Sequence, residues 1–140
     1  MDKMLLKISA KSENERLART CVSAFLLPLN PSVEEIGDVK TAVSEAVTNA
    51  VVHAYPHGEE GEIEIFCQRL DNELHITITD FGAGIEDVQT ALEPFFSTKS
   101  EEDRSGMGFT IMKTFMNELS VDSKIGMGTK VYMVKRFNVS

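Results

Sequence analysis

The pattern that most constrains the fold lies mid-chain, where apolar and polar residues alternate over two short segments. The alternating apolar residues are Ile63, Ile65, Leu74, Ile76 and Ile78, and Asp71-Asn72 separates the two segments. Because alternate side chains of a strand point to opposite faces, this pattern predicts a β-hairpin with one buried face. A sheet of this kind must pack its apolar face against a second layer.

Helical spacing before the hairpin predicts that layer. The capping-box patterns Ser12-x-x-Glu15 and Ser32-x-x-Glu35 predict the starts of two helices, the second ending near Ala54. The expected apolar stripe of the first helix is Leu17, Cys21, Ala24 and Phe25. The expected stripe of the second is Ile36, Val39, Val43, Val47 and Ala50.

The remaining elements complete a single domain over residues 1–140. Residues 3–9 read as a strand, 107–119 as a helix with Met112 and Met116 as core filling, and 120–124 and 129–137 as closing strands. Grouped helices beside antiparallel strands favour an α+β two-layer sandwich, in which a mixed, mainly antiparallel sheet carries helices on one face.

Composition excludes several function classes. The 14 basic and 22 acidic side chains give a net charge of −8, which argues against a protein that coats nucleic acid or binds an anionic membrane surface. The sequence has no apolar run long enough for a membrane span and no secretion-signal layout at its start. Cys21 and Cys67 have no metal or disulfide spacing and are interpreted as core thiols of a cytoplasmic protein.

A polar ridge is expected on the second helix. Glu45, Asn49 and His53 recur every four residues, so an α-helix would place them on one face. The ridge could simply face solvent. Small alanines beside the polar residues, including Ala50 and Ala54, instead leave room for a ligand to approach.

A second candidate follows the hairpin, in the string Asp80-x-Gly82-x-Gly84-Ile85. Asp80 has the parity of the buried strand positions, so its carboxylate should point inward, where it needs a hydrogen-bond donor. That donor could be a backbone N–H or the exocyclic amine of a bound base. The glycines would let the backbone approach a flat ligand closely.

Two further glycine segments are weaker candidates. Arg104-Ser-Gly-Met-Gly108 precedes a predicted helix, whose free N–H groups could bind phosphate or be capped by Ser105. The polar stretch 97–100 before it could be a lid over a ligand or a plain loop. Gly126-Met-Gly128-Thr129 could be a hairpin turn that needs no ligand.

Together, in this order, the four segments resemble the boxes of the GHKL ATPase superfamily, which includes gyrase, Hsp90, MutL and histidine kinases. The strings Ser44-Glu-Ala-Val-Thr-Asn-Ala50 and Arg104-Ser-Gly-Met-Gly-Phe-Thr-Ile-Met112 look like those of the anti-sigma-factor serine kinases within it. The resemblance covers nearly the whole chain. It implies the GHKL fold, ATP and Mg²⁺ as cofactors, and protein-serine kinase activity.

The resemblance also implies roles for particular residues. Glu45 would be the general base, Asn49 a Mg²⁺ ligand, Asp80 the acceptor for the adenine amine, and Arg104 a contact to the γ-phosphate. The other expected nucleotide contacts are His53, Gly82, Gly84, Ile85, Lys99, Ser105, Gly106, Met107, Gly108 and Thr129. Arg19 matches a family residue implicated in partner binding, although the sequence alone would make it a solvated arginine.

The partners implied are the sporulation sigma factor F, held inactive by an ATP-bound homodimer, and an anti-anti-sigma factor whose serine is phosphorylated. In the family the first strand and helix contribute to the dimer interface. Three alternatives remain open at this point: a general-stress kinase with different partners, a nucleotide-gated sigma-binding module without transfer, and a histidine-kinase catalytic fragment.

Overall fold

In the computed structural model, the residues described are 2–55, 60–85, 88, 92 and 108–138. The strands in this part of the chain are β1 (Asp2–Ser9), β2 (Glu62–Leu70), β3 (Glu73–Asp80), β4 (Glu118–Lys124) and β5 (Gly128–Arg136). The helices are α1 (Asn14–Leu26), α2 (Val33–Asn49) and α4 (Gly108–Phe115), with a 3₁₀ turn at Leu27–Leu29 and a π-helical turn at Ala50–Ala54.

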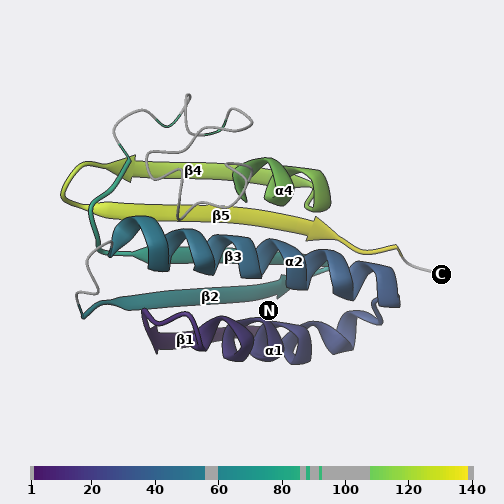
Figure 1. The fold of residues 1–140 in the computed structure, drawn as a ribbon. Helices are drawn as coiled ribbons and strands as arrows, with labels where there is room; N and C mark the ends of the chain where they lie inside the picture. Colours follow the sequence, from purple (N-terminus) through teal and green to yellow (C-terminus); the bar gives the residue numbers. More distant parts are fainter. Residues whose placement is uncertain (1, 56–59, 86–87, 89–91, 93–107, 139–140) are drawn as a thin grey trace.

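The molecule has two layers, as the sequence predicts (Figure 1). The strands form one sheet in the order β1-β2-β3-β5-β4. Each pair of neighbours in that order is antiparallel, so the described strands form a purely antiparallel sheet rather than a mixed one. The helices cover one face of the sheet, with α2 between α1 and α4.

The predicted hairpin of β2 and β3 is confirmed. Asp71 has a left-handed φ of 54° at the turn, a conformation that aspartate tolerates better than most residues. Ile65 and Ile78 lie opposite each other and both are buried under the helices. The hairpin therefore supplies the centre of the apolar layer, and it brings Asp80 to the same end of the sheet as the end of α2.

The core confirms the predicted stripe of α2 but not that of α1. Val39, Val43 and Val47 are fully buried. On α1 the buried residues are Ala18, Val22 and Leu26, whereas Leu17 is 48% exposed. The prediction for α1 was therefore wrong in phase by about one residue, because the i, i+4 row that packs into the core is Ala18, Val22 and Leu26.

The two predicted capping boxes also have different outcomes. At the start of α2, the backbone N–H of Glu35 donates to Ser32 Oγ (3.0 Å), and the N–H of Ser32 donates to Glu35 Oε1 (2.8 Å). The hydrogen bond that the Glu35 carboxylate accepts from the Ser32 N–H is the main cause that lowers the pKa of this carboxyl. At the start of α1 the N-cap position is Glu13 and no side chain caps the helix, so the box at Ser12 was a wrong prediction.

The third helix is shorter than predicted. It ends at Phe115, and Glu118 already pairs with Val134 in the sheet, because the backbone hydrogen bonds of β5 take over from the helical ones. Met112 and Met116 are buried, as expected for core residues. Cys67 is fully buried, and desolvation raises the pKa of its thiol to about 12, which fits its interpretation as an inert core thiol.

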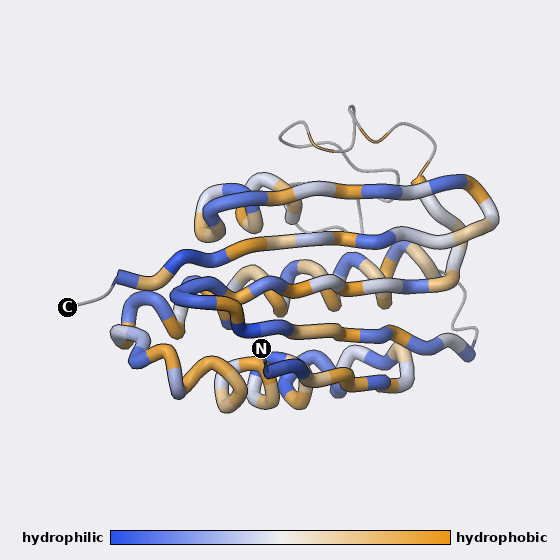
Figure 2. The backbone as a smooth tube through the Cα atoms, turned by 180° about the vertical axis from the view of Figure 1, so that it is seen from behind, coloured by the Kyte–Doolittle hydropathy of each residue, from blue (hydrophilic) through white to orange (hydrophobic). Residues whose placement is uncertain are grey.

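The opposite face of the sheet carries no described helix or strand (Figure 2). Thr77, Tyr132 and Lys130 on this face are polar and at least partly exposed, whereas Val134 is apolar and buried. Among the described residues, no helix combines the length and the apolar character needed to cross a membrane.

The difference between the two caps can be measured. Ser32→Ala removes the acceptor for the N–H of Glu35 and should lower the free energy of unfolding by about 1 kcal/mol in urea denaturation. Ser12→Ala is the matched control and should change it by less than about 0.5 kcal/mol, as expected at an exposed position without a cap. Equal losses for the two variants would contradict the assigned caps.

Candidate functional site

Several segments meet at one end of the helix layer. They are the end of α2 with its π-helical turn, the loop after β3, the turn between β4 and β5, and the first residue of α4. Each of the four sequence candidates contributes at least one described residue to this region. The sequence predicts these segments separately, and the fold brings them together.

The C-terminal half of α2 provides the predicted polar ridge. Glu45 and Asn49 are both half-buried and lie one helical turn apart, about 6 Å along the axis. Asn49 is the last residue of α2, and His53 lies in the π-helical turn that follows. Because a π-turn has more residues per turn than an α-helix, the four-residue spacing that aligns Glu45 with Asn49 does not fix the direction of His53.

Asn49 directly faces the start of α4. A Cβ atom added at Gly108 would lie 2.7 Å from Asn49 Nδ2 and 2.9 Å from Asn49 Oδ1. The absence of a side chain at Gly108 is therefore what allows the Asn49 amide to reach the helix N-terminus. This contact joins two predicted site residues that are 59 positions apart in the sequence.

Asp80 is a buried carboxylate at the end of β3, with an exposed fraction of 6%. Its Oδ1 accepts hydrogen bonds from the backbone N–H groups of Gly82 (3.1 Å) and Thr129 (3.2 Å). Desolvation raises the pKa of Asp80, and the two hydrogen bonds oppose that rise. The inward direction predicted from parity is correct. Both bonds go to Oδ1, so they do not use the acceptor capacity of Oδ2.

The glycine loop after β3 is held against the end of α2. Ala83 N–H donates to the Ala54 carbonyl at 3.1 Å, and a Cβ at Gly82 would lie 2.2 Å from the same oxygen. Gly84 has a φ of +78° and packs against the backbone of Lys124. The loop can therefore lie between the π-helical turn and the end of β4, because Gly82 and Gly84 have no side chains.

Two residues outside the predicted set organise this region. Ser123 Oγ accepts from the N–H of Ile85 at 2.7 Å and lies 2.7 Å from Thr129 Oγ1, so it links β4, β5 and the glycine loop. Tyr55 OH accepts from Phe81 N–H and donates to the Glu62 carbonyl, both at 2.9 Å. The sequence gives only a weak signal for either residue. Ser123 is an ordinary serine in a predicted strand, and Tyr55 is a tyrosine before a proline.

Some predicted residues cannot be placed. Lys99, Arg104, Ser105, Gly106 and Met107, together with the lid segment 97–100, lie outside the described residues, and their roles stay predictions.

Arg19 lies on α1, and its environment is not that of a freely solvated arginine. Its Nε pairs with Glu15 Oε1 at 3.4 Å, and Glu15 also accepts a short hydrogen bond from Ser44 Oγ on α2. Arg19 is thus connected to the residue that precedes Glu45. Glu15, predicted as part of a capping box, instead joins the two helices.

The family model described as "Histidine kinase-like ATPase domain" matches residues 8–135. Proteins named anti-sigma F factor are similar over nearly their whole length. The one from Caldanaerobacter subterraneus is 54% identical over 132 residues, covering 94% of this chain and 92% of that protein. The one from Clostridium perfringens is 50% identical over 137 residues, covering 98% of each.

Solved structures share the fold. The RsbU and RsbW domains of Rv1364c from Mycobacterium tuberculosis match 98% of this chain and 32% of that one, with a TM-score of 0.69 and 18% identity. Full-length ShkA in complex with AMPPNP matches 100% of this chain and 32% of its own, with a TM-score of 0.62 and 15% identity. At these identities the likeness shows the fold alone, and it agrees with the predicted α+β sandwich.

The crowded turn between β4 and β5 allows a direct test of the packing around Asp80. Gly128 has a φ of +86°, and an added Cβ would lie 2.1 Å from the Asp80 carbonyl, whereas Gly126 has a φ of +79° and open space around it. Gly126→Ala should lower the free energy of unfolding by about 1 kcal/mol, the cost of a left-handed alanine. Gly128→Ala adds a clash and should cost roughly 2–4 kcal/mol by chemical denaturation. Equal costs would contradict the described packing.

Proposed function

The chain belongs to the histidine kinase-like ATPase family and, within it, to the anti-sigma F factors, and from this premise we propose that it is an ATP- and Mg²⁺-dependent protein-serine kinase that also sequesters a sigma factor. The observation that carries the proposal is the contact between the Asn49 amide and Gly108, at the end of the helix layer where the buried Asp80 also lies. A nucleotide needs a hydrogen-bond acceptor for its base. Its phosphates need backbone N–H donors and a site for a cation.

Asp80 suits the base end of such a ligand. Adenine presents an exocyclic amine, which is a hydrogen-bond donor, and the carboxylate of Asp80 is an acceptor. The bonds from Gly82 and Thr129 hold Oδ1 in place and so fix the direction in which Oδ2 points. Gly84 and Ile85 would line the same end, with Ile85 anchored by Ser123.

The Asn49 and Gly108 contact suits the phosphate end. The first N–H groups of a helix are free of intrahelical partners and favour anions, and α4 begins at Gly108. A neutral amide oxygen such as Asn49 Oδ1 is an acceptable ligand for Mg²⁺ and adds no negative charge beside a triphosphate. When bound, ATP with Mg²⁺ would supply the γ-phosphoryl group; Lys99, Arg104, Ser105, Gly106 and Met107 are proposed as its further contacts.

Glu45 is proposed as the general base. It lies one turn before Asn49 on α2, so a serine hydroxyl that reaches the γ-phosphate would pass close to its carboxylate. The proton moves from the serine hydroxyl to Glu45 while the oxygen attacks phosphorus and the bond to the β-phosphate oxygen breaks. Positioning and charge neutralisation supply most of the rate in this class of reaction.

The proposed partners are a sigma factor, taken as the sporulation sigma factor F, and an anti-anti-sigma factor that provides the acceptor serine, with the kinase acting as a homodimer in the cytoplasm. The names of the similar proteins support the sigma factor. Arg19 is the proposed partner contact on α1. Its link through Glu15 to Ser44 would connect that surface to the helix that carries Glu45.

The base pocket can be tested with two nucleotides. Asp80→Asn keeps an oxygen for the N–H groups of Gly82 and Thr129 but replaces the second acceptor by an NH₂ donor. We expect ATP to bind roughly 10- to 100-fold more weakly, because a donor would face the adenine amine. The base of ITP carries an oxygen in place of the adenine amine. The affinity of the variant for ITP should therefore fall less than its affinity for ATP, or should rise. Isothermal titration calorimetry with both nucleotides and Mg²⁺ measures this, and an unchanged ATP affinity would contradict the assignment.

The transfer step is tested by Glu45→Gln. Removal of the base should lower phosphoserine formation on an anti-anti-sigma protein by roughly 10²–10⁴-fold while ATP affinity stays within a few-fold. The matched control is Asn49→Ala, which should weaken Mg²⁺-dependent ATP binding itself.

The outcome also separates the alternatives. Sigma binding that depends on ATP, with no phosphoserine in the wild type, would identify a nucleotide-gated sigma-binding module. Transfer to a stress-response substrate in place of a sporulation one would identify the general-stress kinase.

A further inference from the structure

A row of polar side chains crosses three strands on the helix-covered side of the sheet. The strand registers align Asp80 on β3 with Thr129 on β5, and Thr129 with Ser123 on β4. The row continues into β2 and β1 with the buried Ile63 and Ile8. The next row on the same face of the described sheet is apolar and comprises Leu6, Ile65, Ile78, Val131 and Val121. The polar row therefore departs from the pattern of the core, and it lies where the base of a nucleotide is proposed to bind.

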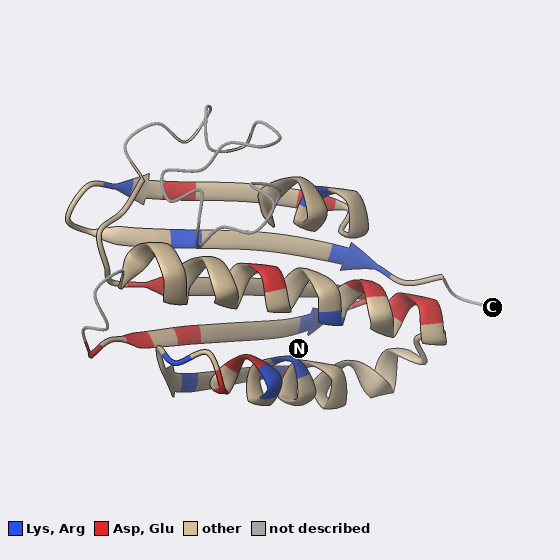
Figure 3. Cartoon of the chain, viewed as in Figure 1, with Lys and Arg blue, Asp and Glu red and all other residues tan. Residues whose placement is uncertain are grey.

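Ser123 belongs to this row, although its two neighbours on β4 do not. Asp122 and Lys124 are exposed and have the opposite parity, so they point to the other face of the sheet. Figure 3 shows the acidic and the basic segment of β4. Ser123 is half-buried, and Thr129 beside it has an exposed fraction of 9%. The two hydroxyls thus meet in a largely desolvated place, where a hydrogen bond is electrostatically stronger than in water.

In the described part of the chain, three polar groups lie within hydrogen-bond distance of the Ser123 hydroxyl. The N–H of Ile85 donates to Oγ at 2.7 Å, and Oγ can donate to the Gly128 carbonyl at 3.0 Å. Thr129 Oγ1 lies 2.7 Å away, and either hydroxyl could be the donor in that contact. A hydroxyl has one proton and two lone pairs. Because Ile85 occupies one lone pair, the open choice is where the single proton of Ser123 points.

This choice decides what the Thr129 hydroxyl offers to a ligand. If Ser123 donates to the Gly128 carbonyl, it accepts from Thr129, and Thr129 presents only lone pairs. If Ser123 donates to Thr129, a chain of donors runs from the N–H of Ile85 through Ser123 to Thr129, whose own proton can then point at a ligand. The two arrangements differ only in the rotation of hydroxyl protons.

The base edge of adenine requires the second arrangement. Adenine carries an amine donor next to a ring-nitrogen acceptor, N1, so its complement is an acceptor beside a donor. Asp80 lies opposite Thr129 in the sheet and offers Oδ2 as the acceptor, because its Oδ1 is taken by backbone N–H groups. Thr129 completes the pair when its hydroxyl donates. Hypoxanthine and guanine carry a carbonyl and an N–H on the same edge and would require the reverse.

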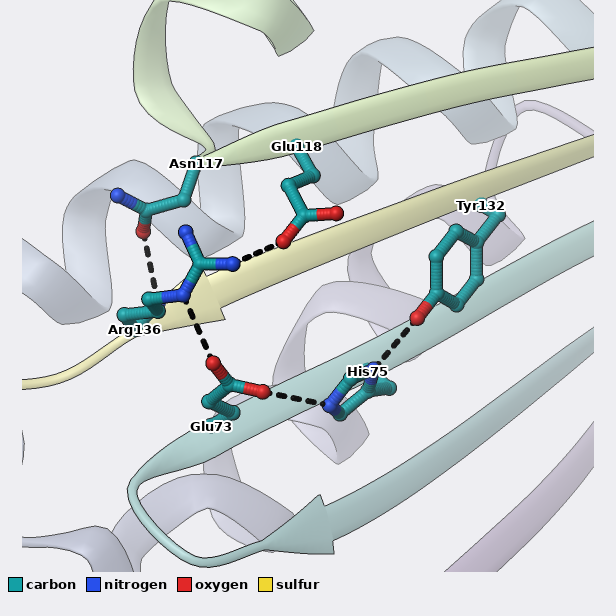
Figure 4. Close-up of polar contacts among 6 residues, drawn as sticks. All are labelled: Glu73, His75, Asn117, Glu118, Tyr132 and Arg136. Carbon is teal, nitrogen blue, oxygen red and sulfur yellow. Dashed lines mark hydrogen bonds and ion pairs between the residues drawn. The ribbon is translucent and has the colours of Figure 1, made fainter.

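The direction of these hydroxyls is not fixed by charge, unlike that of the network on the opposite face of the sheet (Figure 4). There the carboxylates of Glu73 and Glu118 accept and the Arg136 guanidinium can only donate. In the Ser123 row, the N–H of Ile85 supplies the bias. A hydroxyl that accepts a hydrogen bond becomes a better donor, because hydrogen bonds in a chain polarise one another.

We propose that Ser123 is a positioning residue that sets base specificity. It orients the Thr129 hydroxyl as a donor to N1 of adenine, directly or through one water. The proposal rests on the nucleotide site of the proposed function and adds to it a residue outside the predicted contacts. A serine that only joined β4, β5 and the glycine loop would make the same hydrogen bonds. The two roles differ in which nucleotides bind more weakly when the hydroxyl is removed.

The experiment compares ATP with 1-deaza-ATP, in which a C–H group replaces N1, by isothermal titration calorimetry with Mg²⁺. The wild type should bind ATP roughly tenfold more tightly, the value of about one hydrogen bond. Ser123→Ala should weaken ATP binding by roughly five- to tenfold and change 1-deaza-ATP binding by less than about twofold. Ser123→Thr keeps the hydroxyl and should keep the preference for ATP. Ser123→Cys keeps the size but has a weak donor, so it should lose most of the preference and replaces alanine if that variant fails to fold.

Two further variants make the result specific. Thr129→Val removes the last donor of the chain, and its combination with Ser123→Ala should reduce the preference no further than either change alone. Tyr132→Phe is the matched control, because it removes a hydroxyl of the same strand that contacts His75 on the opposite face. It should leave the preference for ATP unchanged.

Equal losses of affinity for the two nucleotides in Ser123→Ala would identify a purely structural serine and overturn the inference. A wild type that bound ATP and 1-deaza-ATP equally well would also overturn it. In both cases the measured ATP binding would leave the kinase proposal standing. A wild type that bound neither nucleotide would overturn the proposed function together with this inference, so the two failures are distinguishable.

Discussion

The structure depends on a carboxylate buried at the end of β3. Burial of Asp80 is tolerable because the N–H groups of Gly82 and Thr129 donate to it, and those two donors belong to the glycine loop and to the start of β5. The same carboxylate therefore joins the central strand, the loop and the β4–β5 turn. The loop in turn packs on the last residues of the long helix. This one arrangement brings the ends of three elements to the place where Asn49 meets Gly108.

The two faces of the sheet differ in character. The helix-covered face is apolar, and at its end it carries the residues proposed to hold the nucleotide. The opposite face carries at least partly exposed side chains such as Thr77, Tyr132 and Lys130, and no described helix or strand covers it.

Much of this could be predicted from the sequence because the signals were local. The β2–β3 hairpin follows from strict alternation, the start of α2 from its capping box, and the inward direction of Asp80 from parity. The errors arose where tertiary contacts overrode local pattern. Glu15 bonds to Ser44 of another helix instead of capping its own, and β4 takes residues from the predicted third helix because Val134 pairs with Glu118. Ser123 and Tyr55 were missed because their partners are distant in sequence.

The central claim is that the end of α2, the glycine loop and the start of α4 surround one metal-bound nucleotide. Backbone amide NMR with ¹⁵N-labelled protein, titrated with a non-hydrolysable ATP analogue and Mg²⁺, tests it residue by residue. The account predicts the largest shift changes at Asn49, Gly82, Gly108 and Thr129, with Phe66 and Tyr132 on the sheet face opposite the helices little affected. Saturating analogue that left the amides of Gly82 and Gly108 unchanged would contradict it.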